Sequence, residues 1–237
     1  MTQVVILCGG LGTRIGLETK FKPKPMILIN GKPILWHLMT YYKNQGFNDF
    51  ILAAGYKNKI IKKYFKKNKE FKTKVINTGL NTGTAGRIMK VKKYLNKKND
   101  YFLMTYGDGL SDVNLKKIIK FHISNKKIAT LTAVHPPVRF GELKFKKNSI
   151  SKFDEKPQTG VGWINAGFFV LNKKIFKYLT DTSSMLEREP LSKMSKENQL
   201  AGYKHYGFWH CVDTVRDKKL LEKMIKDNKK LWLNEFL

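Results

Sequence analysis

The sequence predicts an α/β protein with a mostly parallel sheet and helices on both of its faces. Short apolar runs, typical of buried strands, alternate over the first 135 residues with segments whose apolar residues recur at helical offsets of three and four. This alternation indicates parallel strands joined by crossover helices. The chain has 237 residues and 42% apolar residues, which suffices for one packed core without stabilising disulfide bonds or metal ions. We therefore expect a single domain.

The elements of the first half follow in order from these patterns. Apolar runs bounded by turn residues predict strands at residues 4–7, 50–54, 74–76, 101–106 and 129–134. Helical spacing predicts helices from Ile34, Ile60 and Ile88 onward, and the last of these reaches Leu95. No internal repeat or low-complexity linker interrupts the series.

The sequence pattern changes in the second half of the chain, after Pro136. Shorter segments at residues 141–145, 150–153 and 163–171 predict β structure added beside the main sheet, where it would shape a second substrate site. A last amphipathic helix begins near Val215 and ends in a lysine-rich turn.

A glycine-rich loop follows the first strand. Gly9, Gly10 and Gly12 let the backbone turn tightly and bring its N–H groups against phosphate oxygens. Arg14 and Lys24 add positive charge, and the prolines around Lys24 restrict its backbone. The spacing is neither that of a P-loop nor that of a dinucleotide site. We predict a nucleoside triphosphate here; the alternative from the loop alone is a turn that uses glycine only for its shape.

Two aspartates follow apolar runs. Asp108 comes directly after the strand predicted at residues 101–106, at the edge where parallel sheets bind ligands, and Asp213 precedes the last helix. Two carboxylates that meet suit one Mg²⁺, which takes one or two carboxylates together with substrate phosphates. The alternatives are a turn former for Asp108 and a helix N-cap for Asp213.

The sequence signals for a second substrate and for catalytic groups are weaker than those for the nucleotide. Lys156 suits the phosphate of a second substrate and Glu155 its hydroxyl groups, although a surface charge cluster gives the same pattern. No arrangement of serine, cysteine or histidine indicates a nucleophile. An attacking phosphate monoester is already an anion and needs no general base. We therefore expect catalysis by positioning and charge neutralisation.

The formal net charge of +28 raises the question of a nucleic acid or an anionic membrane as partner. Lysine predominates, in runs that fit solvated helix faces, and no nucleic-acid-binding motif is present. We expect neither partner, and a field that attracts anionic substrates; a basic nucleic-acid-binding protein is the alternative outside the enzyme class. Cys8 and Cys211 show no metal-ligand spacing and no disulfide framework. Without a leader or a run of bilayer length, a soluble, cytoplasmic protein is expected.

In their order along the chain, these motifs resemble those of the sugar-1-phosphate nucleotidyltransferases, and within that family the enzymes that use CTP and glucose 1-phosphate. The similar segments are residues 9–14, 22–25, 31–37, 78–87, 105–109, 139–141, 155–157, 165–169 and 207–214. The resemblance implies a Rossmann-like fold of the nucleotide-diphospho-sugar transferase type, with a mostly parallel mixed sheet. It also implies transfer of a cytidylyl group from CTP to a sugar 1-phosphate, with release of pyrophosphate. Residues 1–135 would form the nucleotide-binding half and residues 136–237 the acceptor-binding half of one domain, in a possible homo-oligomer.

The resemblance further implies roles for individual residues. The nucleotide would be bound, with Thr82 and Arg87 next to its base, by Leu7, Cys8, Gly9, Gly10, Leu11, Gly12, Thr13, Thr82, Arg87 and Gly107. The catalytic cations would be Arg14, Lys24 and Lys156, and the Mg²⁺ ligands Asp108 and Asp213. The acceptor would be bound by Glu155, Lys156, Asn165 and Gly167.

The sequence departs from the family pattern at three places. Cys8 stands where a small alanine is usual and is expected to pack, and Asn77 replaces an aspartate. Residues 65–75 form a shorter segment than in the CTP-dependent enzymes. The alternatives are therefore another phosphorylated acceptor, such as phosphoglutamine, transfer of a thymidylyl, uridylyl or guanylyl group, or a nucleotide-binding module without catalysis.

Overall fold

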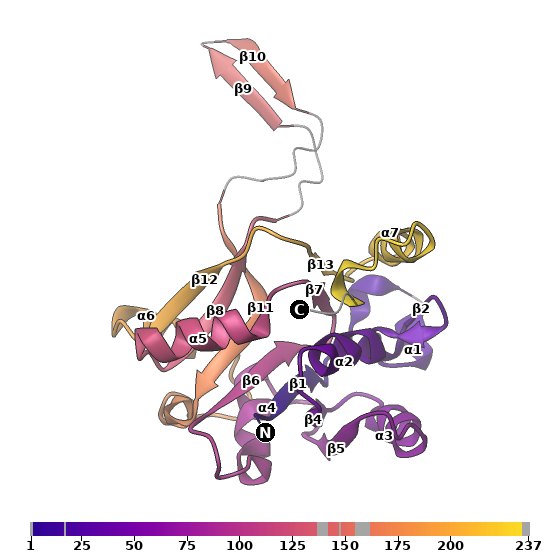
Figure 1. The fold of residues 1–237 in the computed structure, drawn as a ribbon, viewed down its shortest axis with the longest axis vertical. Helices are drawn as coiled ribbons and strands as arrows, with labels where there is room; N and C mark the ends of the chain where they lie inside the picture. Colours follow the sequence, from indigo (N-terminus) through magenta and orange to yellow (C-terminus); the bar gives the residue numbers. More distant parts are fainter. Residues whose placement is uncertain (1, 17, 137–141, 147, 155–161, 234–237) are drawn as a thin grey trace.

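The computed structural model describes residues 2–16, 18–136, 142–146, 148–154 and 162–233, and its course is drawn in Figure 1. The strands are β1 Val4–Cys8, β2 Leu28–Ile29, β3 Lys32–Pro33, β4 Asp49–Ala54, β5 Lys72–Asn77, β6 Tyr101–Tyr106, β7 Gly109–Ser111, β8 Ala129–Val134, β9 Glu142–Lys146, β10 Ser149–Asp154, β11 Ile164–Asn172, β12 Leu200–Lys204 and β13 Trp209–Cys211. The α-helices are α1 Glu18–Phe21, α2 Ile34–Asn44, α3 Asn58–Lys67, α4 Thr84–Val91, α5 Leu115–Asn125, α6 Glu189–Lys196 and α7 Val215–Lys226. Short 3-10 helices are η1 Thr13–Ile15, η2 Lys24–Met26, η3 Lys92–Tyr94, η4 Lys173–Lys177 and η5 Leu231–Leu233.

Seven strands form the main sheet, in the order β12-β8-β11-β6-β1-β4-β5. Neighbouring strands run parallel except where β11 pairs antiparallel with β6 and with β8. The predicted α/β class with a mostly parallel mixed sheet is confirmed. Its parallel arrangement places the ends of β1 and β6 side by side.

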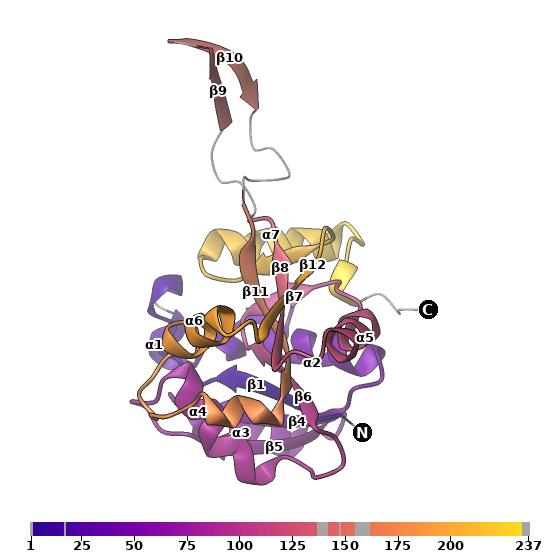
Figure 2. The same cartoon turned by 90° about the vertical axis from the view of Figure 1, so that its left-hand side faces the viewer.

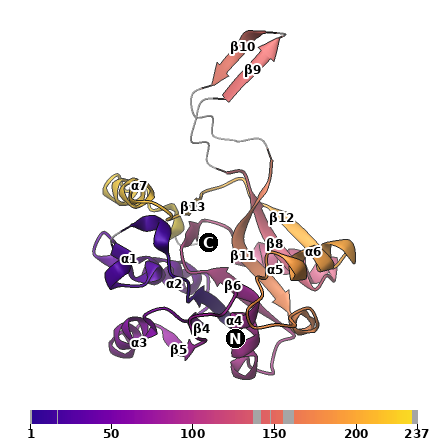
Figure 3. The same ribbon diagram turned by 180° about the vertical axis from the view of Figure 1, so that it is seen from behind.

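Alternate residues of β1 divide the core between the two faces of the sheet. Val4 and Ile6 belong to a cluster with apolar residues of α2, α3, α5 and α7, whereas Val5 and Leu7 pack with residues of α4 and α6. Helices on both sides of the sheet can be followed in the turned views (Figures 2 and 3). Because β1 is buried throughout, its sequence is a continuous apolar run without alternation.

The expectation that residues 163–171 lie beside the main sheet is wrong. They form β11, which lies inside the sheet between β8 and β6. The physical reason is visible in the strand itself, where residues 166–171 are buried without interruption, as suits a strand covered on both faces. The second half of the chain therefore contributes to the same sheet edge as the first.

The other two predicted β segments pair only with each other. β9 and β10 form an antiparallel two-stranded hairpin that projects from the body in all three views (Figures 1–3). Here the expectation of β structure outside the main sheet is confirmed.

Two helix predictions meet different outcomes. The helix from Ile88 was expected to reach Leu95, but α4 ends at Val91 and the chain tightens into η3, a geometry that commonly closes the last turn of a helix. The final helix begins at Val215 as predicted. Among the described residues, no helix has the length and apolar character needed to cross a membrane.

Candidate active site

A cleft of about 600 Å³ opens at the carboxyl ends of β1 and β6. It brings together most of the residues that the sequence singled out: Leu7, Cys8, Gly9, Gly10, Gly12, Thr13, Lys24, Thr82, Arg87, Gly107, Asp108, Asn165 and Asp213. These residues come from six separate segments, and the crossover connections bring them together at one edge of the sheet. This is the edge at which open α/β sheets bind ligands.

Five further residues were expected at the site: Leu11, Arg14, Glu155, Lys156 and Gly167. Leu11 is half exposed and does not line the cleft. Arg14 lies in η1, and the described structure does not extend to its side chain. Glu155 and Lys156 lie outside the described residues. Gly167 lies within β11, next to the lining residue Ala166, and does not itself line the cleft.

Arg87 fixes the glycine loop from below. The residue is 4% exposed, and its guanidinium donates hydrogen bonds to Gly9 O at 3.0 Å, Gly79 O at 2.9 Å and Thr78 Oγ1 at 2.5 Å. A Cβ on Gly9 would come within 2.0 Å of the guanidinium, so this close approach requires glycine. Arg87 thus ties the loop after β1 to the loop after β5.

Cys8 packs beneath the same loop. Its thiol is buried in the core, and this burial raises the pKa of Cys8 to about 12. The side chain therefore stays a neutral thiol at physiological pH, as expected for a packing residue.

Lys24 lies between the two predicted metal ligands. It starts η2 directly after Pro23, and its side chain is buried with Nζ 2.5 Å from Asp108 Oδ2 and 2.6 Å from Asp213 Oδ1. Burial alone would lower the pKa of Lys24, but the adjacent carboxylates of Asp108 and Asp213 raise the pKa above its ordinary value. A permanent cation therefore lies at the point where the two acids meet.

Short backbone pairing holds the two acids together. β7 follows Asp108 and pairs antiparallel with β13, which precedes Asp213, and Val212 N donates to Asp108 O at 2.9 Å. Asp213 is not the N-cap of α7: that position is Thr214, whose hydroxyl and backbone form a capping box with Asp217. The Asp213 carboxylate is consequently directed to Lys24.

Cys211 is a donor that sequence reasoning missed. One ligand atom each from Asp108, Cys211 and Asp213 lie within 4.8 Å of one another. The sequence shows no metal-ligand spacing because Cys211 is brought to Asp108 by the β7–β13 pairing. Its position two residues before Asp213, on the same strand end, was the available signal.

The base-side and acceptor-side residues have defined polar partners. Thr82 Oγ1 donates to Thr78 O at 2.6 Å and accepts from Lys90 Nζ at 3.1 Å. Asn165 Nδ2 is 3.5 Å from the hydroxyl of Tyr106. Both side chains line the cleft.

Tyr106 and Glu187 are further lining residues that sequence reasoning did not select. The hydroxyl of Tyr106 donates to Glu187, and Thr84 Oγ1 donates to the second Glu187 oxygen at 2.6 Å. Burial and the neighbouring carboxylate raise the pKa of Tyr106, which keeps its hydroxyl protonated. Tyr106 had a signal, because it directly precedes the Gly107 and Asp108 motif, whereas Glu187 lies in an irregular segment without one.

Substitution of Gly167 by alanine is expected to disturb the part of the cleft that Asn165 lines. Gly167 has φ of +82° and a Cβ there would lie 2.4 Å from the Tyr106 ring. The strain should lower the free energy of unfolding by about 1 to 3 kcal/mol, measured by urea denaturation. Gly202→Ala is the control, since a Cβ there meets no atom within 4 Å, and equal stability losses in both variants would contradict the assignment.

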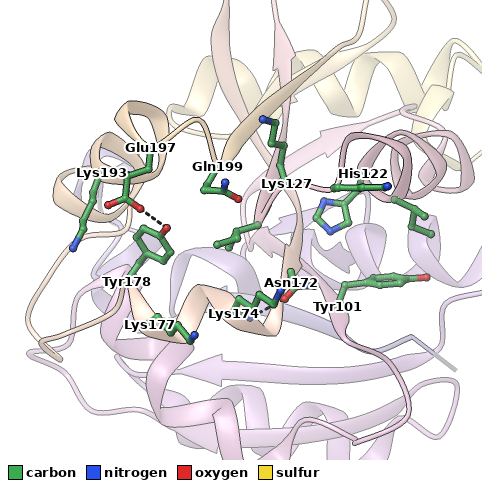
Figure 4. Close-up of a pocket in the computed structure, with 13 residues that line it drawn as sticks. Tyr101, His122, Lys127, Asn172, Lys174, Lys177, Tyr178, Lys193, Glu197 and Gln199 are labelled. Carbon is green, nitrogen blue, oxygen red and sulfur yellow. Dashed lines mark hydrogen bonds between the residues drawn. The ribbon is translucent and has the colours of Figure 1, made fainter.

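A second hollow of about 770 Å³ lies at the opposite end of β6, next to Tyr101 (Figure 4). Lys174 and Lys177 of η4 and His122 of α5 are among its lining residues (Figure 4). Glu197 accepts a hydrogen bond from Tyr178 at 2.5 Å. The two aspartates and the glycine loop line the cleft at the other end of β6, so the cleft is the candidate active site.

His122 in this second hollow makes stability depend on pH. Its ring is 4% exposed, with Nδ1 2.9 Å from Thr130 Oγ1, and burial lowers the pKa of His122 from 6.5 to about 4. Since the unfolded chain binds the proton first, the stabilisation is complete above pH 6.5 and is lost as the pH falls toward 4, by about 3 kcal/mol in all.

Urea denaturation as a function of pH measures this dependence. The stability difference between the wild type and His122→Gln should shrink as the pH is lowered through this range. A pH-independent difference for His122→Gln would refute the assignment.

The donor atoms of Asp108, Cys211 and Asp213 fit a divalent cation. Two carboxylates face one point, a thiol lies beside them, and a lysine ammonium already stands there as a cation. Oxygen donors of this kind are those that Mg²⁺ prefers. The residues that would hold the metal are Asp108 and Asp213.

Comparison with known proteins agrees with this geometry. The model of the nucleotidyl transferase family matches residues 3–217, and the chain belongs to this family of enzymes. The predicted resemblance to sugar-1-phosphate nucleotidyltransferases is confirmed by a glucose-1-phosphate cytidylyltransferase from Salmonella typhimurium, 40% identical over 253 aligned positions that cover 97% of this chain and 98% of the relative. A probable glucose-1-phosphate cytidylyltransferase from Bacillus subtilis gives the same values.

A solved structure extends the similarity to three dimensions. HddC from Yersinia pseudotuberculosis, in complex with GMP-PN, matches with a TM-score of 0.74 at 28% identity, covering 95% of this chain and all of HddC. The described residues therefore share the fold of HddC.

Proposed function

We propose that this protein transfers a cytidylyl group from CTP to glucose 1-phosphate, giving CDP-glucose and pyrophosphate. The observation that carries the proposal is the meeting of Asp108 and Asp213 around the Lys24 ammonium, beside the glycine loop. The names of the two relatives that are 40% identical over almost the whole chain support CTP and glucose 1-phosphate as the substrates.

The nucleotide would occupy the wall formed by the glycine loop and the segment from Thr82 to Arg87. The loop amides would face the phosphates, and Thr82 would contact the base. Because the Arg87 guanidinium already donates to Gly9 and Gly79, we propose that it serves base recognition by holding both loops in place. Its effect on nucleotide binding is then indirect.

The acceptor would occupy the part of the cleft that Asn165 and Tyr106 line. Asn165 lies beside Tyr106, and its Oδ1 accepts from Gly167 N at 2.9 Å, at the irregularity within β11. We propose that Asn165 binds sugar hydroxyl groups. As predicted from the sequence, Lys156 would bind the sugar phosphate and Glu155 the sugar hydroxyl groups.

The proposed reaction is a direct displacement. A phosphate oxygen of the acceptor attacks the α-phosphorus of CTP in line, and the bond from that phosphorus to the bridging oxygen breaks, so that pyrophosphate leaves with the electron pair. Mg²⁺ held by Asp108 and Asp213 would offset the negative charge of the phosphates. Lys24 stays charged because the two acids raise its pKa, and it supplies positive charge to the same region. No covalent enzyme intermediate and no general base are needed.

A pyrophosphate-release assay tests the proposal. Each of CTP, UTP, dTTP and GTP is combined with glucose 1-phosphate, mannose 1-phosphate or phosphoglutamine, with and without Mg²⁺. Turnover is expected with CTP and glucose 1-phosphate and should require the metal. Activity with GTP alone would favour the guanylyl alternative, which the GMP-PN complex of HddC supports, and activity with phosphoglutamine alone would replace the acceptor.

A further inference from the structure

The donor set of Asp108, Cys211 and Asp213 in the cleft is not that of a pure magnesium site. Asp108 and Asp213 offer carboxylate oxygens, whereas Cys211 offers sulfur, and one donor atom of each lies within 4.8 Å of the others. Mg²⁺ takes oxygen ligands, while a thiolate favours softer ions such as zinc. Three protein donors with an open fourth position are a common arrangement at zinc centres.

The surroundings of this cluster already favour a cation. The side chain of Lys24 is more than nine-tenths buried and points into the cluster, where its ammonium contacts both carboxylates. A buried ammonium held by oxygen atoms at 2.5 and 2.6 Å marks a point where positive charge is stabilised.

We propose that Asp108, Cys211 and Asp213 form a three-donor site for a soft divalent cation, zinc or cadmium. In the metal-free protein the Lys24 ammonium contacts the two carboxylates, and it competes with the cation for them. Sulfur of Cys211 binds as the thiolate and its proton passes to solvent. The inference rests on the proposed function in one respect: the same two carboxylates would hold Mg²⁺ during turnover. A soft cation bound here therefore excludes Mg²⁺ and inhibits the transferase.

Cadmium alone, titrated into the full-length protein without nucleotide, tests the site directly. Thiolate coordination to cadmium produces a charge-transfer absorption in the ultraviolet, which reports sulfur ligation and does not depend on activity. The wild type should show a saturable band. Cys211→Ser should lose the band and bind cadmium at least about tenfold more weakly.

Three further variants make the result specific. Cys8→Ala should keep the band, because the Cys8 thiol is buried beneath the loop with a raised pKa. Asp213→Asn should keep a thiolate band but require more cadmium to reach it, by about tenfold. Lys24→Met should bind cadmium about tenfold more tightly than the wild type, because the competing ammonium is gone.

The outcomes separate this inference from the proposed function. A band that persists in Cys211→Ser, or no band in a folded wild type as judged by circular dichroism, would overturn the soft-cation site whatever the transferase assay shows. A saturable band that requires Cys211, in a protein without CTP-dependent turnover, would support the site and overturn only the proposed substrates.

Discussion

Asp108→Asn and Asp213→Asn are each expected to lower Mg²⁺-dependent turnover by at least about a thousandfold. Each substitution removes one of two carboxylates that meet at a single point, and an amide oxygen carries no net charge with which to hold a divalent cation. The loss should appear mainly in kcat, measured by pyrophosphate release at saturating CTP and glucose 1-phosphate.

Asp112→Asn is the matched control for this prediction. Asp112 follows β7 and its carboxylate is 2.8 Å from His205 Nε2, outside the residues that line the cleft. The control should therefore keep near-normal turnover. Circular dichroism and thermal denaturation check that all three variants fold, and near-normal rates in a folded Asp108 or Asp213 variant would refute the metal assignment.

Arg87→Ala is expected to lower the free energy of unfolding by about 3 kcal/mol or more, because Gly9 O, Gly79 O and Thr78 Oγ1 lose their buried donor. The glycine loop and the Thr78 loop would no longer be joined, so nucleotide affinity should also fall. Urea denaturation measures the first effect and calorimetric titration of CTP the second.

Comparison of nucleotides separates this role from direct recognition of the base. If Arg87 holds the loops, the affinities for CTP and UTP should fall by similar factors in Arg87→Ala, and Arg87→Lys should recover part of the stability. Unchanged stability together with a selective loss of CTP binding would instead assign the guanidinium to the base.

Much of the fold follows from the sequence because its patterns are local. β1 and β6 are continuous apolar runs, and α7 begins where Thr214 and Asp217 can form a capping box. The placement of β11 could not be predicted in this way. Whether a buried strand lies at the edge or in the middle of a sheet depends on pairing with β6 and β8, which are distant in sequence.

The candidate site shows the same division. Lys24, Asp108 and Asp213 were predictable because each follows a recognisable strand or motif and parallel strands end at one edge. That Lys24 lies between the two acids, and that Cys211 joins them, depends on distances between side chains that no spacing encodes. Arg87 was expected next to the base, and its hydrogen bonds to Gly9 and Gly79 show a second role that a motif alone does not reveal.

The most direct measurement is a crystal structure with Mn²⁺ and a non-hydrolysable CTP analogue, in which anomalous scattering locates the metal. The account predicts one anomalous peak between the carboxylates of Asp108 and Asp213, Lys24 displaced from at least one of them, and the triphosphate against the amides of the glycine loop. A metal bound elsewhere with Lys24 still between the two acids, or a nucleotide outside the cleft, would contradict it.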